Sequence, residues 1–208
     1  MAKVKLEYGR YYHIYNRGNN RENLFHGPRH YRYFLQLYAK YIPPVADTFA
    51  YCLLPNHFHF GLRTRTEEEQ EVFFDRNRDL ESDPLFMLRH PSRAFNNFFI
   101  AYARSFNNET KRTGALFESP FERTLVDNQQ YLLRLITYIH HNPQTHGFVN
   151  DFRDWPWTSY GAMLSSGATK IDRDEVLDWF NGRSHFTDAH ATEQDEKTIA
   201  PLLMEDWF

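Results

Sequence analysis

The segment from His57 to Arg63 constrains the fold more than any other part of the chain, because every second residue in it is a large apolar one and those between are His, Gly or Arg. In an extended strand the odd positions share one face, which begins with His57 and His59. The even positions share the opposite face, which is wholly apolar. Pro55-Asn56 before this segment is a turn signal, and residues 48–54 before the turn are rich in strand-forming residues. The sequence therefore predicts a β-hairpin with one apolar and one polar face.

The other periodic segments predict a mixture of strands and helices. Further strands are expected at 11–17 and 123–126, and helices at about 31–41, 92–107 and 129–141. Ser92 is the expected cap of the second helix, and Asp127 or Asn128 that of the third. Because Pro143 disfavours helical geometry at Asn142, the third helix is expected to end there. This order of elements predicts an α+β fold in which helices pack on an antiparallel sheet.

The charge distribution is more informative than the net charge of −3. Residues 1–63 hold nine Lys and Arg against three Asp and Glu, whereas residues 150–208 hold five against twelve. This asymmetry favours a basic working half beside two acidic parts, an excursion at 64–91 with a short helix and a C-terminal tail. Ordinary surface charge is the alternative. The tail is expected to be dispensable for the fold, so that deletion after Gly167 leaves the fold intact. The alternative is that Val176, Trp179 and Phe180 pack on the domain.

Several classes of protein are excluded by simple counts. The single cysteine, Cys52, excludes a disulfide framework and a cysteine-rich zinc site. No apolar run approaches membrane-spanning length, and the first residues lack the apolar segment of a signal peptide. We therefore expect a cytoplasmic protein without a membrane partner. At 208 residues, it is expected to form one domain over 1–165 and an acidic extension over 166–208.

Two groups of residues are suited to chemistry. His57 and His59 project from the same strand face, which is the geometry of a shared divalent metal, although an ordinary polar face remains the alternative. Tyr138 and Asn142 share one face of the predicted helix, at the C-terminal end where the helix dipole favours a cation. A tyrosine at the edge of the core is the alternative there.

Three other histidines have less certain roles. His13 on the first strand is an extra ligand, a phosphate contact, or simply a packed or exposed side chain. His140 and His141 lie beside Tyr138 in sequence, so either is a candidate base for activating it.

Six basic residues are candidates for contacts with a nucleic-acid backbone, because Lys and Arg supply most non-specific affinity. They are Arg10, Arg17, Arg21, Lys111, Arg112 and Arg123.

Five ordered blocks resemble those of the REP-associated tyrosine transposases, chromosomal relatives of single-strand insertion-sequence transposases in the HUH endonuclease superfamily. The resemblance covers about residues 8–165. The blocks are Tyr12-His13-Ile14-Tyr15-Asn16-Arg17-Gly18, Leu54-Pro55-Asn56-His57-Phe58-His59, Arg112-Thr113-Gly114-Ala115-Leu116-Phe117, Tyr138-Ile139-His140-His141-Asn142-Pro143 and Trp155-Pro156-Trp157-Thr158-Ser159-Tyr160.

This resemblance implies a ferredoxin-like sheet, the HUH endonuclease fold, and a role for each matched residue. His57, His59 and Asn142 would bind a divalent metal ion, Mg²⁺ or Mn²⁺, and Tyr138 would be the nucleophile. The implied activity is that of a metal-dependent transposase which binds hairpin-forming single-stranded DNA and cleaves and rejoins it through a 5′-phosphotyrosine link. The expected assembly is a monomer or homodimer. The acidic excursion and tail depart from the family pattern.

Two other functions are consistent with the same residues. One is a catalytically silent module of the same fold that binds DNA or RNA hairpins, although such a module has no use for an intact set of catalytic residues. The other is a metal-dependent phosphodiesterase that uses water in place of tyrosine.

Overall fold

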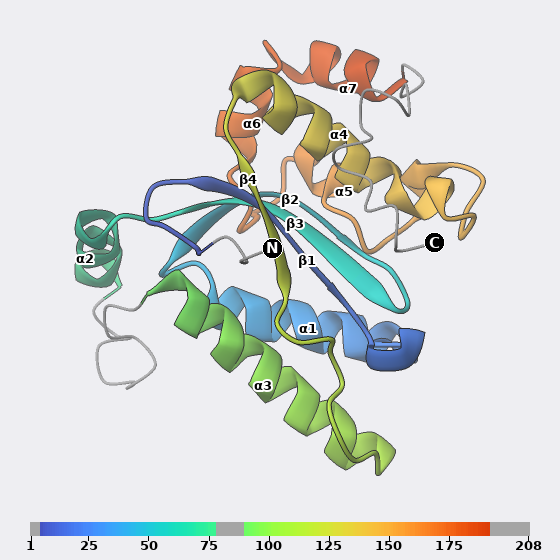
Figure 1. Ribbon diagram of the computed structural model, residues 1–208. Helices are drawn as coiled ribbons and strands as arrows, with labels where there is room; N and C mark the ends of the chain where they lie inside the picture. Colours follow the sequence, from blue (N-terminus) through green and yellow to red (C-terminus); the bar gives the residue numbers. More distant parts are fainter. Residues whose placement is uncertain (1–4, 78–89, 192–208) are drawn as a thin grey trace.

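The computed structural model describes residues 5–77 and 90–191 (Figure 1). The strands are β1 (Tyr11–Arg17), β2 (Ala46–Leu53), β3 (His57–Thr64) and β4 (Glu122–Val126). The helices are α1 (Pro28–Tyr41), α2 (Glu67–Arg76), α3 (Pro91–Thr110), α4 (Gln129–Thr145), α5 (Tyr160–Leu164), α6 (Arg173–Trp179) and α7 (Arg183–Ala191), with short 3-10 turns at Asn19–Arg21 and Phe152–Asp154.

The four strands form one antiparallel sheet in the order β2-β3-β1-β4. With α1 between β1 and β2 and α3 before β4, this is the ferredoxin-like arrangement, and the predicted α+β class is confirmed. The register pairs Arg17 of β1 with His57 of β3 and Tyr15 with His59. The last residues of β1 therefore lie beside the histidines that open β3.

Helices cover both faces of the sheet (Figure 1). On one face, α1 and α3 pack against the even-numbered side chains of β3, and Phe58 and Phe60 are fully buried there. Phe58 lies 5.2 Å from Phe34 of α1, and Phe60 stacks on Tyr38 at 4.2 Å, both between ring centroids. On the other face lies α4, followed by α5, α6 and α7. The alternation predicted for β3 is confirmed.

A glycine allows α4 to approach β3 closely. A Cβ atom at Gly61 would lie 3.3 Å from Ile139 Cδ1 and 3.8 Å from Leu135 Cδ2 of α4. Gly61 follows His57 and His59 on the same strand face, so the missing side chain brings the helix onto the sheet beside the two imidazoles.

Two predicted helix ends were wrong. The third helix does not stop at Asn142 but continues as α4 to Thr145, with Pro143 inside its last turn. Proline removes only its own N–H, and the His146 N–H still donates to the Asn142 carbonyl, so the turn closes. The cap of α3 is His90 and not Ser92, because the His90 ring accepts the Ser92 N–H. Asn128 caps α4, as one of the two predicted alternatives.

The C-terminal region packs on the domain, at least as far as residue 191. Val176 and Phe186 are fully buried and Phe180 nearly so, all within the apolar cluster that α4 shares with β2. Trp179 contacts Phe49 at 4.7 Å between ring centroids. Of the two alternatives for the tail, packing through these side chains is the one observed. A boundary at residue 165 stays a prediction, and 192–208 lie outside the described residues.

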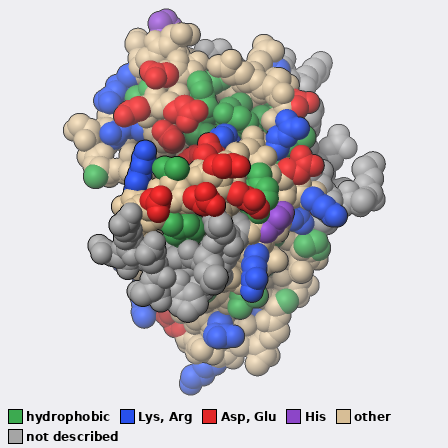
Figure 2. Space-filling view, turned by 90° about the vertical axis from the view of Figure 1, so that its left-hand side faces the viewer, with side chains coloured by type: hydrophobic (Ala, Val, Ile, Leu, Met, Phe, Trp, Pro, Cys, Tyr) green, Lys and Arg blue, Asp and Glu red, His purple; other side chains and the backbone are tan. Residues whose placement is uncertain are grey.

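Residues 78–89 of the acidic excursion lie outside the described residues. Its described part lies at the end of the sheet farthest from His57. It follows the last residue of β3, and α2 begins with a capping box between Thr66 and Glu69. The exposed carboxylates of α2 are Glu67, Glu68, Glu71 and Asp75. Figure 2 shows acidic side chains gathered on this side of the molecule. Their charge disfavours a nucleic-acid backbone here and leaves the His57 end free of this repulsion.

Candidate functional site

The candidate site lies where the start of β3 faces the C-terminal part of α4. His57 and His59 project from the α4 side of the sheet, with ring centroids 5.2 Å apart and planes nearly perpendicular. The side chains are 7% and 5% exposed, so they are buried under the helix and not on an open face. His57 Nδ1 lies 2.8 Å from Asn56 Oδ1. Because an amide oxygen only accepts, Nδ1 carries the proton, and the lone pair of the ring is on Nε2.

A third imidazole joins this pair from the neighbouring strand. His13 of β1 is 1% exposed, and its Nε2 lies 2.9 Å from His59 Nδ1. The two rings stack at 5.1 Å between centroids. His13 is therefore packed in the interior, which is one of the predicted alternatives, and its ring nitrogen is hydrogen-bonded to a predicted metal ligand.

α4 brings Tyr138 and Asn142 onto the same cluster. The Tyr138 ring lies 5.8 Å from His59 and 6.2 Å from His13 between centroids, edge-on to both. Asn142 Nδ2 donates to the Tyr138 carbonyl at 2.8 Å. Since that carbonyl can only accept, the amide orientation is fixed and Oδ1 points the other way. The structure thus brings together all four residues that the sequence singled out for catalysis and metal binding.

Two atoms of this cluster have unmet bonding capacity. Within the described residues, His59 Nε2 and Asn142 Oδ1 are among the few buried side-chain nitrogen and oxygen atoms without a hydrogen-bond partner. An unpaired buried polar atom is destabilising by about 1–3 kcal/mol, so native structures rarely keep one without a reason. Nitrogen and amide-oxygen lone pairs of this kind fit a divalent cation. Within 5–77 and 90–191, no group of three His, Cys, Asp or Glu side chains is arranged to hold a metal ion.

Burial keeps the histidines in the form that a metal requires. Desolvation lowers the pKa of His57 to about 3 and that of His13 to about 3, and it lowers the pKa of His59 well below its usual value. All three rings are therefore neutral at pH 7. A neutral imidazole offers a lone pair, whereas an imidazolium ion has none.

The same burial protects the Tyr138 proton. Desolvation raises the pKa of Tyr138 to about 12, and a hydrogen bond from Asn142 opposes this only in part. The phenol therefore stays protonated at neutral pH unless a positive charge or a base is brought close to it.

The proposed bases lie elsewhere. His140 and His141 adjoin Tyr138 in sequence, but both turn toward α7. His140 Nδ1 lies 2.8 Å from His190 Nε2, and His140 Nε2 lies 2.6 Å from Ser159 Oγ. His141 Nε2 donates to the His190 carbonyl at 2.9 Å. Residues one or two positions apart on a helix point in different directions, so His140 and its sequence neighbour His141 contact α7 while Tyr138 faces the sheet.

The sequence reasoning missed one residue of the site. His146 caps α4, and its ring lies 4.8 Å from that of His57 between centroids. Tyr138, Asn142 and His146 are spaced four residues apart, so they form one stripe along α4. The four-residue spacing in the sequence could have identified His146, but the predicted helix ended at Asn142 and so excluded it.

A network of buried hydrogen bonds fastens α7 to α4 and gives the protein a pH dependence. His190 Nδ1 donates to the Phe186 carbonyl at 2.7 Å, so His190 Nε2 must accept from His140. Burial lowers the pKa of His190 to about 4. The unfolded chain takes up this proton below pH 6.5 and the folded chain only below about pH 4, so stability falls as the pH falls through this window. From pH 7 to pH 5, this residue alone is expected to remove about 2 kcal/mol of unfolding free energy.

Urea unfolding of wild type and His190→Gln at pH 7 and pH 5 measures this contribution. The variant is expected to lose about 2 kcal/mol less than wild type between the two pH values. His185→Gln is the matched control, because His185 is exposed on the same helix. An equal pH dependence in wild type and His190→Gln would contradict the assignment.

The predicted phosphate contacts do not form one surface. Arg17 is in register with His57, at one end of the sheet. At this same end, the Gly18 N–H donates to the Asn56 carbonyl and the Asn19 N–H to the Leu116 carbonyl. The two segments that carry Arg21 and Arg112 therefore also lie here. Two of these cations are paired: Arg17 with Glu118 at 2.7 Å and Arg112 with Glu22 at 2.6 Å.

The other three predicted cations differ in position. Lys111 is exposed at the C-terminal end of α3. Arg123 on β4 lies over the Phe121 ring at 4.3 Å. Arg10 precedes β1 at the opposite end from His57, beside Glu7 at 3.7 Å. Whether any of the six binds nucleic acid stays a prediction.

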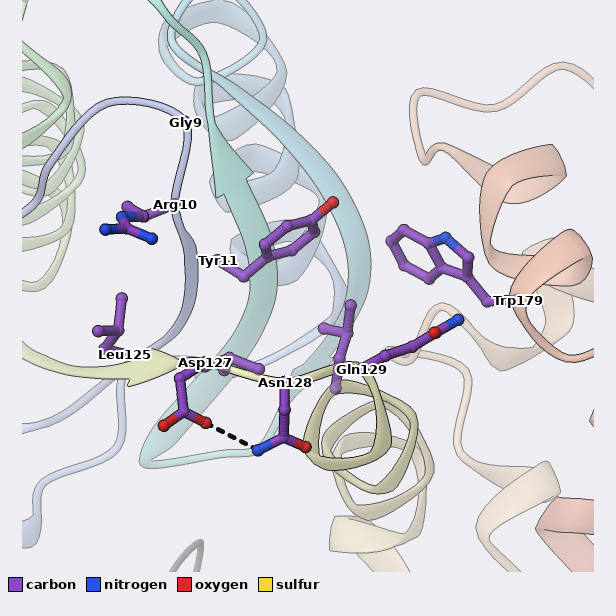
Figure 3. A pocket seen from close by; sticks show the side chains of 10 residues that line it. Gly9, Arg10, Tyr11, Leu125, Asp127, Asn128, Gln129 and Trp179 are labelled. Atoms are coloured by element: carbon purple, nitrogen blue, oxygen red, sulfur yellow. Dashed lines mark hydrogen bonds between the residues drawn. The ribbon is translucent and has the colours of Figure 1, made fainter.

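Arg10 instead lines a separate cavity of about 470 Å³ at the N-terminal end of α4 (Figure 3). Tyr11, Trp179 and the α4 cap Asn128 line the same cavity, and Asn128 bonds to Asp127 at its rim. Tyr138 and Asn142 lie toward the other end of the same helix. The cavity is therefore not part of the histidine and tyrosine cluster.

The block Trp155-Pro156-Trp157 is structural. Trp155 Nε1 donates to the Leu53 carbonyl at 2.9 Å, and the Trp157 ring stacks on Tyr31 at 4.6 Å. These contacts fasten the chain that leaves α4 along the edge of β2.

A ferredoxin-like sheet whose inner strand β3 presents His57 and His59 beneath a helix carrying Tyr138 is the arrangement that the sequence resemblance implied. Comparison with known proteins confirms the resemblance to REP-associated tyrosine transposases. A Haemophilus influenzae protein of that name is 27% identical over 114 residues, which are 55% of this chain. The match spans 58% of that relative, so the chain matches only a little over half of its length.

A solved structure of a REP-associated tyrosine transposase bound to a REP hairpin has the same fold. It aligns with a TM-score of 0.55 over 81% of this chain and 87% of its own, at 17% identity. No protein-family model matches the sequence. Within the described residues, no helix has both the length and the apolar character needed to cross a membrane.

Proposed function

We propose that this protein is a metal-dependent transesterase for single-stranded DNA that binds hairpins and forms a 5′-phosphotyrosine link through Tyr138. The observation that carries the proposal is the convergence of His57, His59, Tyr138 and Asn142, together with two buried atoms, His59 Nε2 and Asn142 Oδ1, that have no hydrogen-bond partner within the described residues. The similarity to transposases, one of them bound to a hairpin, supports the choice of substrate.

His57 Nε2, His59 Nε2 and Asn142 Oδ1 would hold a divalent ion, Mg²⁺ or Mn²⁺. Imidazole donors favour Mn²⁺, since Mg²⁺ prefers oxygen ligands. When bound, the ion supplies positive charge for the scissile phosphate and for ionisation of the nearby phenol. The neutral state of both histidines and the fixed amide of Asn142 prepare the donors before binding, so little reorganisation is required.

Tyr138 supplies the nucleophile. Its oxygen forms a bond to phosphorus while the bond from phosphorus to the 3′ oxygen breaks, and that oxygen leaves as a 3′-OH after taking up a proton. The phosphate remains esterified to the 5′ end of the downstream strand. Because the link conserves the energy of the ester bond, a 3′-OH can reverse the step and join strands without ATP. Arg17, in register with His57, is positioned to contact the phosphate on this side.

The polarity of the adduct tests the function. The full chain is incubated with Mn²⁺ and a pool of hairpin oligonucleotides that carry randomised single-stranded flanks. On a denaturing gel, a label at the 3′ end is expected to migrate with the protein, and a label at the 5′ end to leave on a shorter strand. EDTA should prevent both.

Other outcomes identify the alternatives. Hairpin binding without cleavage would indicate a silent binding module, and cleavage without an adduct would indicate a phosphodiesterase that uses water. Either result would overturn the proposed mechanism.

A further inference from the structure

His13 takes no direct part in the proposed chemistry, but its geometry defines a role beside one of the proposed metal ligands. His13 lies on β1 opposite Gly61 of β3, and Tyr15, two residues later on β1, lies opposite His59. The His13 ring is on the α4 side of the sheet. At 2.9 Å, the contact between His13 Nε2 and His59 Nδ1 is a hydrogen bond between two buried rings. One nitrogen must donate and the other must accept.

The two possible tautomers have different consequences. If His13 donates, His59 Nε2 carries a hydrogen atom, and this buried donor has no acceptor within the described residues. If His59 Nδ1 donates, His59 Nε2 carries a buried lone pair that meets no donor within the described residues. The first arrangement leaves a buried donor without an acceptor. The second leaves an acceptor that a cation satisfies.

We propose that His13 is a positioning residue: its Nε2 accepts the proton of His59 Nδ1 and so holds His59 in the tautomer and ring orientation that binds a divalent cation. The proposal rests on the proposed function, since it concerns the same metal site. Residues that accept the second N–H of a metal-bound histidine fix the tautomer and raise the basicity of the ligand. The stacked rings prevent His59 from turning away.

The substitutions His13→Leu and His13→Gln separate this role from simple packing. Leucine fills much of the space but accepts no hydrogen bond, whereas a glutamine oxygen can replace Nε2 as the acceptor. Mn²⁺ affinity of the DNA-free full chain, measured by electron paramagnetic resonance and calorimetry, is expected to fall roughly 10–100-fold in His13→Leu. In His13→Gln it should stay within a few-fold of wild type. Tyr15→Phe is the matched control, because its ring lies 4.6 Å from His13 on the same strand face.

A second measurement reads the tautomer directly in the wild-type protein. Nitrogen-15 NMR of histidine-labelled wild-type protein without metal distinguishes a ring nitrogen that carries a proton from one that carries a lone pair. We expect His59 to be protonated at Nδ1 and not at Nε2, with His59→Gln providing the assignment. The opposite tautomer would overturn the proposal.

The outcomes also separate this inference from the proposed function. Equal Mn²⁺ affinity in wild type and folded His13→Leu would overturn the role of His13 and leave the metal site intact. Absence of Mn²⁺ binding by wild type would overturn the metal site and this inference together. Equal losses in His13→Leu and His13→Gln would show that His13 acts by packing, not by accepting a hydrogen bond.

Discussion

Tyr138→Phe is expected to abolish the covalent protein–DNA adduct while hairpin binding stays within a few-fold of wild type. The substitution removes only the phenolic oxygen, which is the attacking atom. It keeps the ring, which is 5% exposed and packs edge-on to His59 and His13. Stability should therefore change little, and loss of the adduct would report chemistry and not folding. A denaturing gel with 3′-labelled hairpin DNA gives the adduct, and fluorescence anisotropy gives the affinity.

Tyr131→Phe is the matched control, because Tyr131 is a partly exposed tyrosine two turns earlier on α4. It should form the adduct at the wild-type level. If Tyr138→Phe still forms the adduct and Tyr131→Phe does not, the nucleophile has been assigned to the wrong residue.

Phe58→Ala is expected to reduce the free energy of unfolding by about 3–5 kcal/mol. Phe58 is fully buried among the aromatic rings of α1 and α3, so its removal leaves a cavity that rigid rings cannot fill. Guanidinium unfolding in EDTA measures the loss. Phe148→Ala is the control, since Phe148 is 41% exposed, and it should change stability by less than about 0.5 kcal/mol.

The neighbouring residue on the opposite face should behave differently. His59→Ala is expected to cost about 1–3 kcal/mol, because it removes ring contacts with His13, His57 and Tyr138 and leaves His13 without its hydrogen-bond partner. It should instead remove Mn²⁺ binding and metal-dependent cleavage. Equal destabilisation by Phe58→Ala and His59→Ala, with Mn²⁺ binding retained in the latter, would mean that this histidine is structural.

Local sequence patterns were sufficient to predict some residues of the site and not others. The two-residue period of β3 predicted which side chains share a face, and the four-residue spacing placed Tyr138 and Asn142 together on α4. A proline rule gave the wrong end for that helix, because a single missing N–H near the end of a well-packed helix is tolerated. That error hid His146, which extends the same stripe. Sequence proximity also suggested His140 and His141 as bases, whereas both contact α7.

The sequence by itself determined the elements, their order and the side chains that each face of a strand or helix presents, because those follow from the local geometry of the backbone. Only the tertiary structure decided which of these faces meet. The bond between His13 and His59 depends on the register of β1 and β3, residues 46 positions apart. The approach of Tyr138 to His59 depends on α4 packing over the missing side chain of Gly61. Contacts between distant segments are set by burial and packing of the whole chain, and no periodicity within one segment encodes them.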